Sequence, residues 1–242
     1  MDPQVRPTPD AMPMAVHADG RLPAGVAGLP AARCVFLRAD ERLCYVGQRG
    51  RCVHFIGGGA FKLVRPCADG EDFLIGFRFR GECVGMEALA GGAYRYEAIA
   101  LGDAWVCSVG TDGLKRPAGD ASAFQRTLDA FAGELEHARE RCFLLSRPSA
   151  CERIAIFLHE LSRRLSDQDE CARVLDLPMS REDIACYLSV TRETVSRTLA
   201  NLQGRGIIAV SRRRITVLQP AALARMAHAG GDECDALGGH AS

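Results

Sequence analysis

Ser180-Arg-Glu-Asp-Ile-Ala-Cys-Tyr-Leu-Ser-Val-Thr-Arg-Glu-Thr-Val-Ser-Arg-Thr-Leu199 contains two short helical patterns separated by a break. Ser180 is suited to cap the first helix, and Asp183, three residues later, is an imperfect partner for a capping box. The pair Ser189-Val190 interrupts the period, and Thr191 is a natural N-cap for a second helix that we expect to run to about Gln203. This arrangement predicts a helix-turn-helix.

The expected second helix has an apolar side and a polar side. Glu193, Ser196 and Arg197 share the polar arc, because successive helical residues are rotated by roughly 100°. An arginine can bind guanine with two hydrogen bonds, and a carboxylate can accept one from cytosine. The pattern favours a helix that enters the major groove of DNA, although paired amphipathic helices also occur in all-α domains of other function. The residues predicted to face inward are Val195, Leu199 and Leu202.

A basic β-hairpin is predicted after this helix. Two strand-like runs, Ile207–Val210 and Ile215–Leu218, are connected by Ser211-Arg-Arg-Arg214. From Thr191 to Pro220 six arginines oppose one glutamate, a local charge of +5, whereas the whole chain has 30 basic and 30 acidic residues. Such an excess is typical of a phosphate-binding surface. The residues expected to contact DNA are Ser180, Arg181, Thr191, Arg192, Glu193, Ser196, Arg197, Arg212, Arg213 and Arg214.

The composition is that of a soluble globular protein. The chain has 242 residues, of which 48% are hydrophobic and 25% charged, a length that suits one large or two modest domains. It contains no run of about 18 apolar residues, and its first 30 residues lack the pattern of a secretion signal. We therefore expect a cytoplasmic protein without a membrane span. The 11 cysteines, odd in number and irregular in spacing, argue against a disulfide framework.

The amino-acid composition of the N-terminal half changes near residue 30. Residues 1–30 contain six prolines and few large apolar side chains, which predicts a flexible arm. From 31 to 118, short apolar runs such as Cys52–Ile56 and Trp105–Val109 alternate with glycines. Strands at this spacing indicate a β-sandwich or barrel, which is either a scaffold or a container for a small ligand.

A long helix is predicted within residues 119–146. Its apolar residues alternate in steps of four and three, which is the a/d pattern of a coiled coil. They form a predicted dimer seam, and the alternative is a core helix that lies on the barrel. A break at 146–149 leads into a winged helix-turn-helix domain, 147–220, that begins with an amphipathic helix, and residues 221–242 are expected to form a frayed tail. The dimer seam comprises Phe124, Leu128, Phe131, Leu135, Ala138, Cys142 and Leu145.

This α+β combination of a glycine-punctuated barrel (jelly roll), a dimerisation helix and a C-terminal winged helix-turn-helix resembles the Crp/Fnr transcription regulators. In the Fnr-like branch, a Glu-x-x-Ser-Arg pattern on the recognition helix reads a TTGAT-type half-site, and the matching positions here are Glu193, Ser196 and Arg197. Arg192 departs from that branch and leaves the half-site open. The resemblance implies a homodimeric activator that binds palindromic double-stranded DNA, acts with RNA polymerase and responds to oxygen or redox state.

The resemblance also raises the question of the signal. Cyclic-nucleotide members use a Gly-Glu-Leu turn and an Arg-Ser pair; here Met86 stands in place of that glutamate and no Arg-Ser pair follows, so cyclic AMP is not expected. Fnr holds a [4Fe-4S] cluster with three N-terminal cysteines, absent here, and one barrel cysteine, matched by Cys107. Direct thiol oxidation, or haem bound through His54, are the other modes left open. The substitutes for the missing ligands are Cys34, Cys44 and Cys52.

A different class of function also remains open. The chain could be a small-ligand-binding module or an enzyme with an incidental helical domain. The sequence contains no phosphate loop, no nucleophile elbow and no histidine–carboxylate metal motif, so we expect no catalytic residues. Binding to palindromic DNA distinguishes the two classes.

Overall fold

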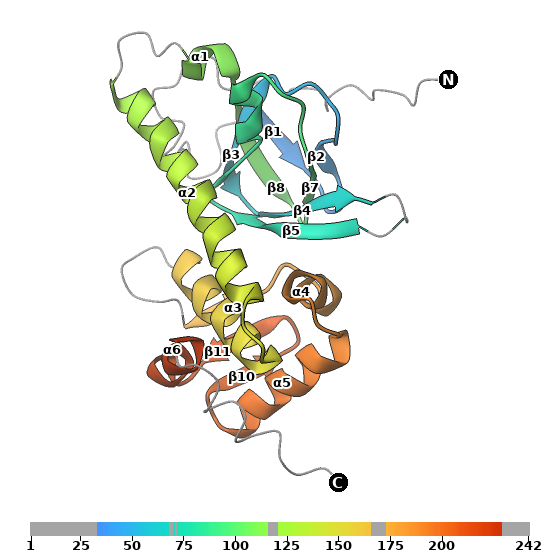
Figure 1. The fold of residues 1–242 in the computed structure, drawn as a ribbon, viewed down its shortest axis with the longest axis vertical. Helices are drawn as coiled ribbons and strands as arrows, with labels where there is room; N and C mark the ends of the chain where they lie inside the picture. The colour runs from blue at the N-terminus through green and yellow to red at the C-terminus, as the bar shows by residue number, and fades with distance from the viewer. Residues whose placement is uncertain (1–32, 68–69, 71, 116–120, 166–172, 229–242) are drawn as a thin grey trace. The chain divides into compact units, whose positions relative to one another are not determined.

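The structure is a computed structural model that describes residues 33–67, 70, 72–115, 121–165 and 173–228 (Figure 1). The arm expected for residues 1–30 lies outside these ranges. The chain divides into two compact units, Met1–Leu135 and Glu136–Ser242. The first contains two β-sheets and the second contains the helix-turn-helix. Among the described residues, no helix combines the length and the apolar character needed to cross a membrane.

The first unit is built from two four-stranded antiparallel sheets, ordered β1-β8-β3-β6 and β2-β7-β4-β5. The predicted barrel is confirmed, with a two-residue strand and the 3-10 helix η1 (Met86–Ala90) that the sequence pattern did not indicate. The strands are β1 Arg33–Leu37, β2 Arg42–Cys44, β3 Cys52–Gly58, β4 Ala60–Pro66, β5 Asp72–Phe79, β6 Cys83–Val84, β7 Glu97–Ala100 and β8 Ala104–Gly110.

Both sheets contribute to one apolar core, because alternate side chains of each strand point to the same face. Phe61 and Leu63 of β4 pack in this core with Ile56 of β3 and Val106 of β8. Close approach inside the fold also explains part of the glycine run after Ile56. A side chain at Gly57 or Gly58 would overlap the Trp105 ring, since an added Cβ atom would lie 2.1 Å or 2.5 Å from it.

The opposite face of the β1-β8-β3-β6 sheet carries a second apolar cluster. Val53, Phe55, Cys107 and Val109 project to this side and pack with residues from two helices. One is Leu114 of the short helix α1 (Thr111–Lys115), and the other is Ala130 of α2 (Ala121–Leu145). The first half of α2 therefore covers this face of the sheet.

Helix α2 confirms the predicted long helix, and its packing face is not the dimer seam. Its inward side chains in the first unit include Thr127, Ala130 and Glu134. At about 100° per residue, these residues lie roughly a quarter-turn from the seam. The described seam residues from Phe124 to Leu135 remain 45–54% exposed, and Ala138 and Cys142 are also exposed. Helix α2 therefore lies on the barrel, as the alternative had it, but through other residues, and the predicted seam residues stay exposed.

A buried ion pair attaches α2 to the sheet. The guanidinium of Arg78 on β5 donates to both carboxylate oxygens of Glu134, over 2.8 Å and 2.7 Å, and also to the carbonyl of Phe77. The Arg78 side chain is 8% exposed and that of Glu134 is 22% exposed. Burial by itself disfavours the cation, but the hydrogen bonds and charge of Glu134 raise the pKa of Arg78 overall.

Replacing Arg78 by methionine is expected to lower the free energy of unfolding by about 2 kcal/mol. Breaking a fully buried ion pair costs about 3–5 kcal/mol, and the partial solvent access of Glu134 reduces that cost. Urea denaturation measures the change. The double variant Arg78→Met/Glu134→Leu leaves neither charge buried and should recover most of the loss. Equal instability of the single and double variants would contradict the role given to the pair.

The second unit contains the predicted winged helix-turn-helix with two additions. Strand β9 pairs with β11 and extends the expected hairpin to a three-stranded sheet of order β10-β11-β9. The tail expected from residue 221 is wrong for its first part: helix α6 packs on α3 through Leu223, Met226 and Ala227. The elements are α3 Ala150–Arg164, β9 Val174–Asp176, α4 Arg181–Leu188, α5 Arg192–Gly204, β10 Ile208–Ser211, β11 Arg214–Val217 and α6 Pro220–His228.

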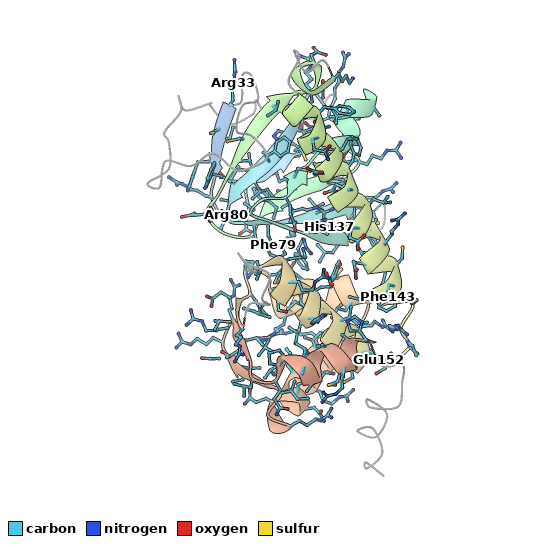
Figure 2. The ribbon with its side chains drawn as sticks, turned by 90° about the vertical axis from the view of Figure 1, so that its left-hand side faces the viewer. Arg33, Phe79, Arg80, His137, Phe143 and Glu152 are labelled. Carbon is cyan, nitrogen blue, oxygen red and sulfur yellow. The ribbon has the colours of Figure 1, made fainter. Side chains whose placement is uncertain are left out.

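The C-terminal end of α2 also belongs to this unit. The Arg141 guanidinium lies 4.9 Å from the centre of the Tyr187 ring on α4, and Leu144 is buried. Phe143 lies near the C-terminal end of α2 (Figure 2). The Arg147 guanidinium lies over its ring, 4.2 Å from the ring centre. The break predicted at 146–149 is present, and Ser149 caps α3 by accepting from the Cys151 amide.

Candidate nucleic-acid interface

Helix α4 begins with a complete capping box. The Ser180 hydroxyl accepts from the Asp183 amide at 3.0 Å, and the Asp183 carboxylate accepts from the Ser180 amide at 2.9 Å and from its hydroxyl at 2.6 Å. The predicted cap is thus better formed than the sequence suggested. Ser180, also expected to contact DNA, has its hydroxyl engaged in fixing the start of α4.

The turn between α4 and α5 is held from outside by Arg153. Ser189 ends α4 in the left-handed region, at φ 52° and ψ 51°. The Arg153 guanidinium of α3 donates to the carbonyls of Leu188 and Ser189, at 2.8 Å and 3.2 Å. It also donates to the carbonyls of Arg147 and Pro148 in the preceding break. The sequence analysis missed Arg153, because nothing in its local pattern distinguishes it from a solvated helix residue.

Helix α5 presents the predicted polar arc to solvent. Thr191 caps it by accepting from the Thr194 amide at 3.2 Å. Val195, Leu199 and Leu202 are buried, so the opposite side of the helix is fixed against the unit. The exposed side chains on the first two turns are those of Arg192, Glu193, Ser196 and Arg197, and none of them has a hydrogen-bond partner among the described residues. These side chains are therefore available to a ligand.

The hairpin next to α5 is tighter than expected. Ser211 pairs with Arg214, so only Arg212 and Arg213 form the turn. Arg214 lies on β11, where its guanidinium binds the Asp176 carboxylate of β9 at 2.7 Å and 3.1 Å. This pairing lowers the pKa of Asp176 through the hydrogen bond from Arg214. The DNA contact predicted for Arg214 stays a prediction. Its guanidinium already has a partner in Asp176, which lies outside residues 191–220, the range with the local charge of +5.

Arg181, at the start of α4, forms no ion pair with any of the described residues. Its Nη1 is buried and has no partner among the described residues, and its Nη2 lies 3.5 Å from the Arg212 carbonyl. Burial lowers the pKa of this guanidinium. The first turn of a helix, with its free amides, already favours an anion, and an unpaired arginine there adds a donor suited to phosphate.

Arg212 occupies a backbone conformation that arginine rarely adopts, with φ 54°. Arg212→Gly is expected to change the free energy of unfolding by less than about 1 kcal/mol, because glycine tolerates this φ but orders at a greater entropic cost. Affinity for DNA should fall, and the slope of log K against log salt should become shallower by about 0.9 per protomer for one lost phosphate contact. Salt-dependent fluorescence anisotropy measures both, and an unchanged slope would remove Arg212 from the interface.

Two protein-family models match most of this chain. A model of the Crp-like helix-turn-helix domain matches residues 152–226, and a model of the cyclic nucleotide-binding domain matches residues 34–116. The fumarate and nitrate reduction regulatory protein of Escherichia coli is 31% identical over 192 residues, which cover 79% of this chain and 77% of that protein. The chain belongs to the Crp/Fnr family.

Solved Crp/Fnr structures agree with the fold. FixK2 from Bradyrhizobium japonicum has 33% identity and a TM-score of 0.73 over 83% of this chain and 100% of that chain. A CRP-family transcriptional regulator from Thermus thermophilus has 28% identity and a TM-score of 0.65 over 82% of this chain and 98% of that one. The protein is thus a DNA-binding transcription regulator of the Crp/Fnr type, as the sequence pattern predicted.

Of the four cysteines proposed as cluster ligands, Cys34 and Cys107 lie side by side on paired strands, and Cys44 and Cys52 do not join them. Cys44 is buried in the core shared by both sheets, and Cys52 is at the start of β3. Burial raises the pKa of both thiols, that of Cys44 to about 12. Within the described ranges, no three cysteine, histidine or acidic side chains form a group that could hold a metal ion. Cys34, Cys44, Cys52 and Cys107 therefore do not fit a four-thiolate iron–sulfur cluster.

His54 is a structural residue in the barrel. Its ring nitrogens lie 2.7 Å from the Ser108 hydroxyl and 3.1 Å from the Tyr94 hydroxyl, and burial lowers its pKa to about 4. The Tyr94 hydroxyl in turn donates to the Cys52 carbonyl at 2.8 Å. Both nitrogens of this neutral imidazole already have partners, so His54 does not fit the axial haem ligand considered from the sequence.

The turn that would hold a cyclic nucleotide in the family is closed by side chains of its own. Glu87 accepts from the Tyr96 hydroxyl at 3.2 Å and from the Arg95 amide at 3.3 Å. The Tyr96 hydroxyl also accepts from the Gly85 amide at 3.2 Å. Met86, at the position where the family pattern has a glutamate, is buried. The Glu87 carboxylate is thus already bound by groups of the protein, and the expectation that cyclic AMP is not the signal stays a prediction.

Proposed function

We propose that the chain is a homodimeric transcription activator that binds a palindromic TTGAT-type site and responds to oxygen level or redox state. The observation that carries the DNA part is the exposed arc of Glu193, Ser196 and Arg197 on a recognition helix whose other side is buried. A carboxylate and an arginine at this spacing suit a half-site that contains C and G.

The exposed dimer seam on α2 supports dimerisation. Exposed apolar residues in steps of four and three over three heptads are typical of a parallel two-stranded coiled coil. A two-fold axis along α2 would present two recognition helices about one turn of DNA apart, roughly 34 Å. A palindrome with that spacing between its halves is the complementary site.

The response to redox state is supported by the relatives and by the thiols. The Escherichia coli relative is named for regulating fumarate and nitrate reduction, and both compounds accept electrons when they are reduced. The described residues of this chain include nine cysteines. As an activator, the bound dimer would recruit RNA polymerase to the promoter.

The test is an electrophoretic mobility shift with three DNA duplexes: the palindrome, a single half-site, and the palindrome with about five additional base pairs at its centre, which rotates one half-site by half a turn. We expect tight binding to the first, and binding at least tenfold weaker to the other two. Equal affinity for all three at low salt would contradict a palindrome-reading dimer. It would favour the alternative of a ligand-binding module.

A further inference from the structure

Two cysteines face each other across neighbouring strands of the first unit. Cys34 on β1 and Cys107 on β8 are direct partners in the antiparallel register. Directly paired residues project to the same face of a sheet, and both belong to the cluster that lies under α1 and α2. Both are free thiols, and the neighbouring Cys34 contributes to the raised pKa of Cys107.

The geometry of the pair is that of a possible disulfide. Antiparallel partners have Cα atoms about 4.5–5.5 Å apart, whichever kind of pair they form, and disulfides span Cα separations of about 4.4–6.8 Å. The third cysteine of this cluster provides a comparison. Cys83 is paired with Phe55 and therefore has no thiol opposite it.

The two thiols differ in their access to solvent. Cys107 is fully buried, and burial together with the neighbouring thiol raises its pKa to about 12. Cys34 is half-buried on the edge strand β1. A small oxidant can therefore reach the Cys34 thiol first. The Cys107 thiol lies opposite Cys34 and is the second thiol of the pair.

We propose that Cys34 and Cys107 form a reversible disulfide when the protein meets a hydroperoxide. The Cys34 sulfur attacks the peroxide, an S–O bond forms as the O–O bond breaks, and water or an alcohol leaves. The Cys107 sulfur then displaces the hydroxyl from Cys34, which leaves as water with the Cys107 proton, and the S–S bond forms. Two thiols are oxidised by two electrons in total, the peroxide is reduced, and a dithiol reductant reverses the reaction.

The location of the pair connects this chemistry to regulation. The same cluster contacts Ala130 of α2, the helix that carries the proposed dimer seam. This inference rests on the proposed redox-responsive regulator and names its thiol pair. Its chemistry can be tested independently of DNA binding.

Tryptic peptide mapping of the full-length protein tests the proposal. Trypsin separates the two cysteines into residues 34–38 and 96–115, each with a single cysteine. After anaerobic reduction, one equivalent of hydrogen peroxide should produce a linked 34–38/96–115 peptide that is 2 Da lighter than the two peptides together and disappears with a dithiol. Absence of this linked peptide, with both cysteines still alkylatable, would overturn the proposal.

Two cysteine variants test the assignment of the thiol pair. Cys107→Ser should leave Cys34 as a sulfenic acid that dimedone traps, whereas Cys83→Ser, the matched control in the same cluster, should leave the linkage intact. Loss of the linkage in Cys83→Ser folded protein would contradict the assigned pair. Palindrome binding by the reduced protein is measured in the same samples. If the linkage forms without palindrome binding, the proposed function fails and the thiol pair stands; the reverse result removes only the thiol pair.

Discussion

Leu135→Glu is expected to convert the dimer into monomers and to weaken palindrome binding at least 100-fold. Leu135 is 51% exposed in the single chain, so the substitution should leave the protomer folded. In the proposed dimer it occupies an a position, where two glutamates would face each other in an apolar seam. Separate protomers lose the gain in affinity, roughly 10²–10⁴-fold, that comes from linking two binding modules.

Sedimentation velocity measures the association, and circular dichroism confirms the protomer fold. Leu135→Met is the matched control, because it keeps an apolar side chain of similar volume at the same position. It should remain dimeric and bind the palindrome normally. A dimeric Leu135→Glu variant would show that the interface lies elsewhere.

Cys142 gives an internal measure of the orientation of the two helices. It is exposed and also occupies an a position, so it meets its own counterpart only in a parallel, in-register dimer. Mild oxidation should then yield a disulfide-linked dimer that Cys142→Ser does not form. An antiparallel arrangement would keep the two thiols apart and give no Cys142-dependent product.

Arg197→Ala is expected to remove sequence discrimination at one base pair of each half-site. Loss of an arginine–guanine contact costs about 1–3 kcal/mol, and the dimer loses it twice. Arg197 is exposed without a partner among the described residues, so the stability of the fold should not change. Competition between palindromic and random duplexes measures the specificity ratio directly. Glu193→Ala should relax discrimination at a different base pair.

Arg225→Ala is the charge-matched control. Arg225 is exposed on α6, away from the recognition helix in sequence. Its substitution by alanine removes the same positive charge as Arg197→Ala. It should change the affinity for palindromic and random DNA alike, and only slightly. If Arg197→Ala behaved in the same way, Arg197 would be a phosphate contact, and the proposed reading of the half-site would be wrong.

Local patterns predicted the parts of the fold that depend on neighbouring residues. The capping box of Ser180 and Asp183, the cap at Thr191 and the extent of α2 all follow from interactions within one or two helical turns. The exposure of the seam residues could also be predicted from the sequence, because their regular heptad pattern differs from the wider apolar face of a core helix.

The features that the sequence could not show depend on residues far apart. Strand β9 has only three residues and exists because it pairs with β11. Arg214 was counted as a free cation because Asp176 lies 38 residues earlier in the chain. The opposition of Cys34 and Cys107 depends on the register of two strands that no local signal fixes. Helix α6 was missed because the glycine-rich end of the chain hid the spacing of Leu223, Met226 and Ala227.

The position of Arg153 has a mechanical consequence. Its planar guanidinium binds carbonyl groups in two segments. One pair, Arg147 and Pro148, precedes α3, and the other, Leu188 and Ser189, lies in the turn between α4 and the recognition helix α5. A rigid fork cannot follow two groups that move apart without losing its hydrogen bonds. We therefore expect the recognition helix to move together with the end of α2, because the hydrogen bonds of Arg153 stiffen the turn between α4 and α5.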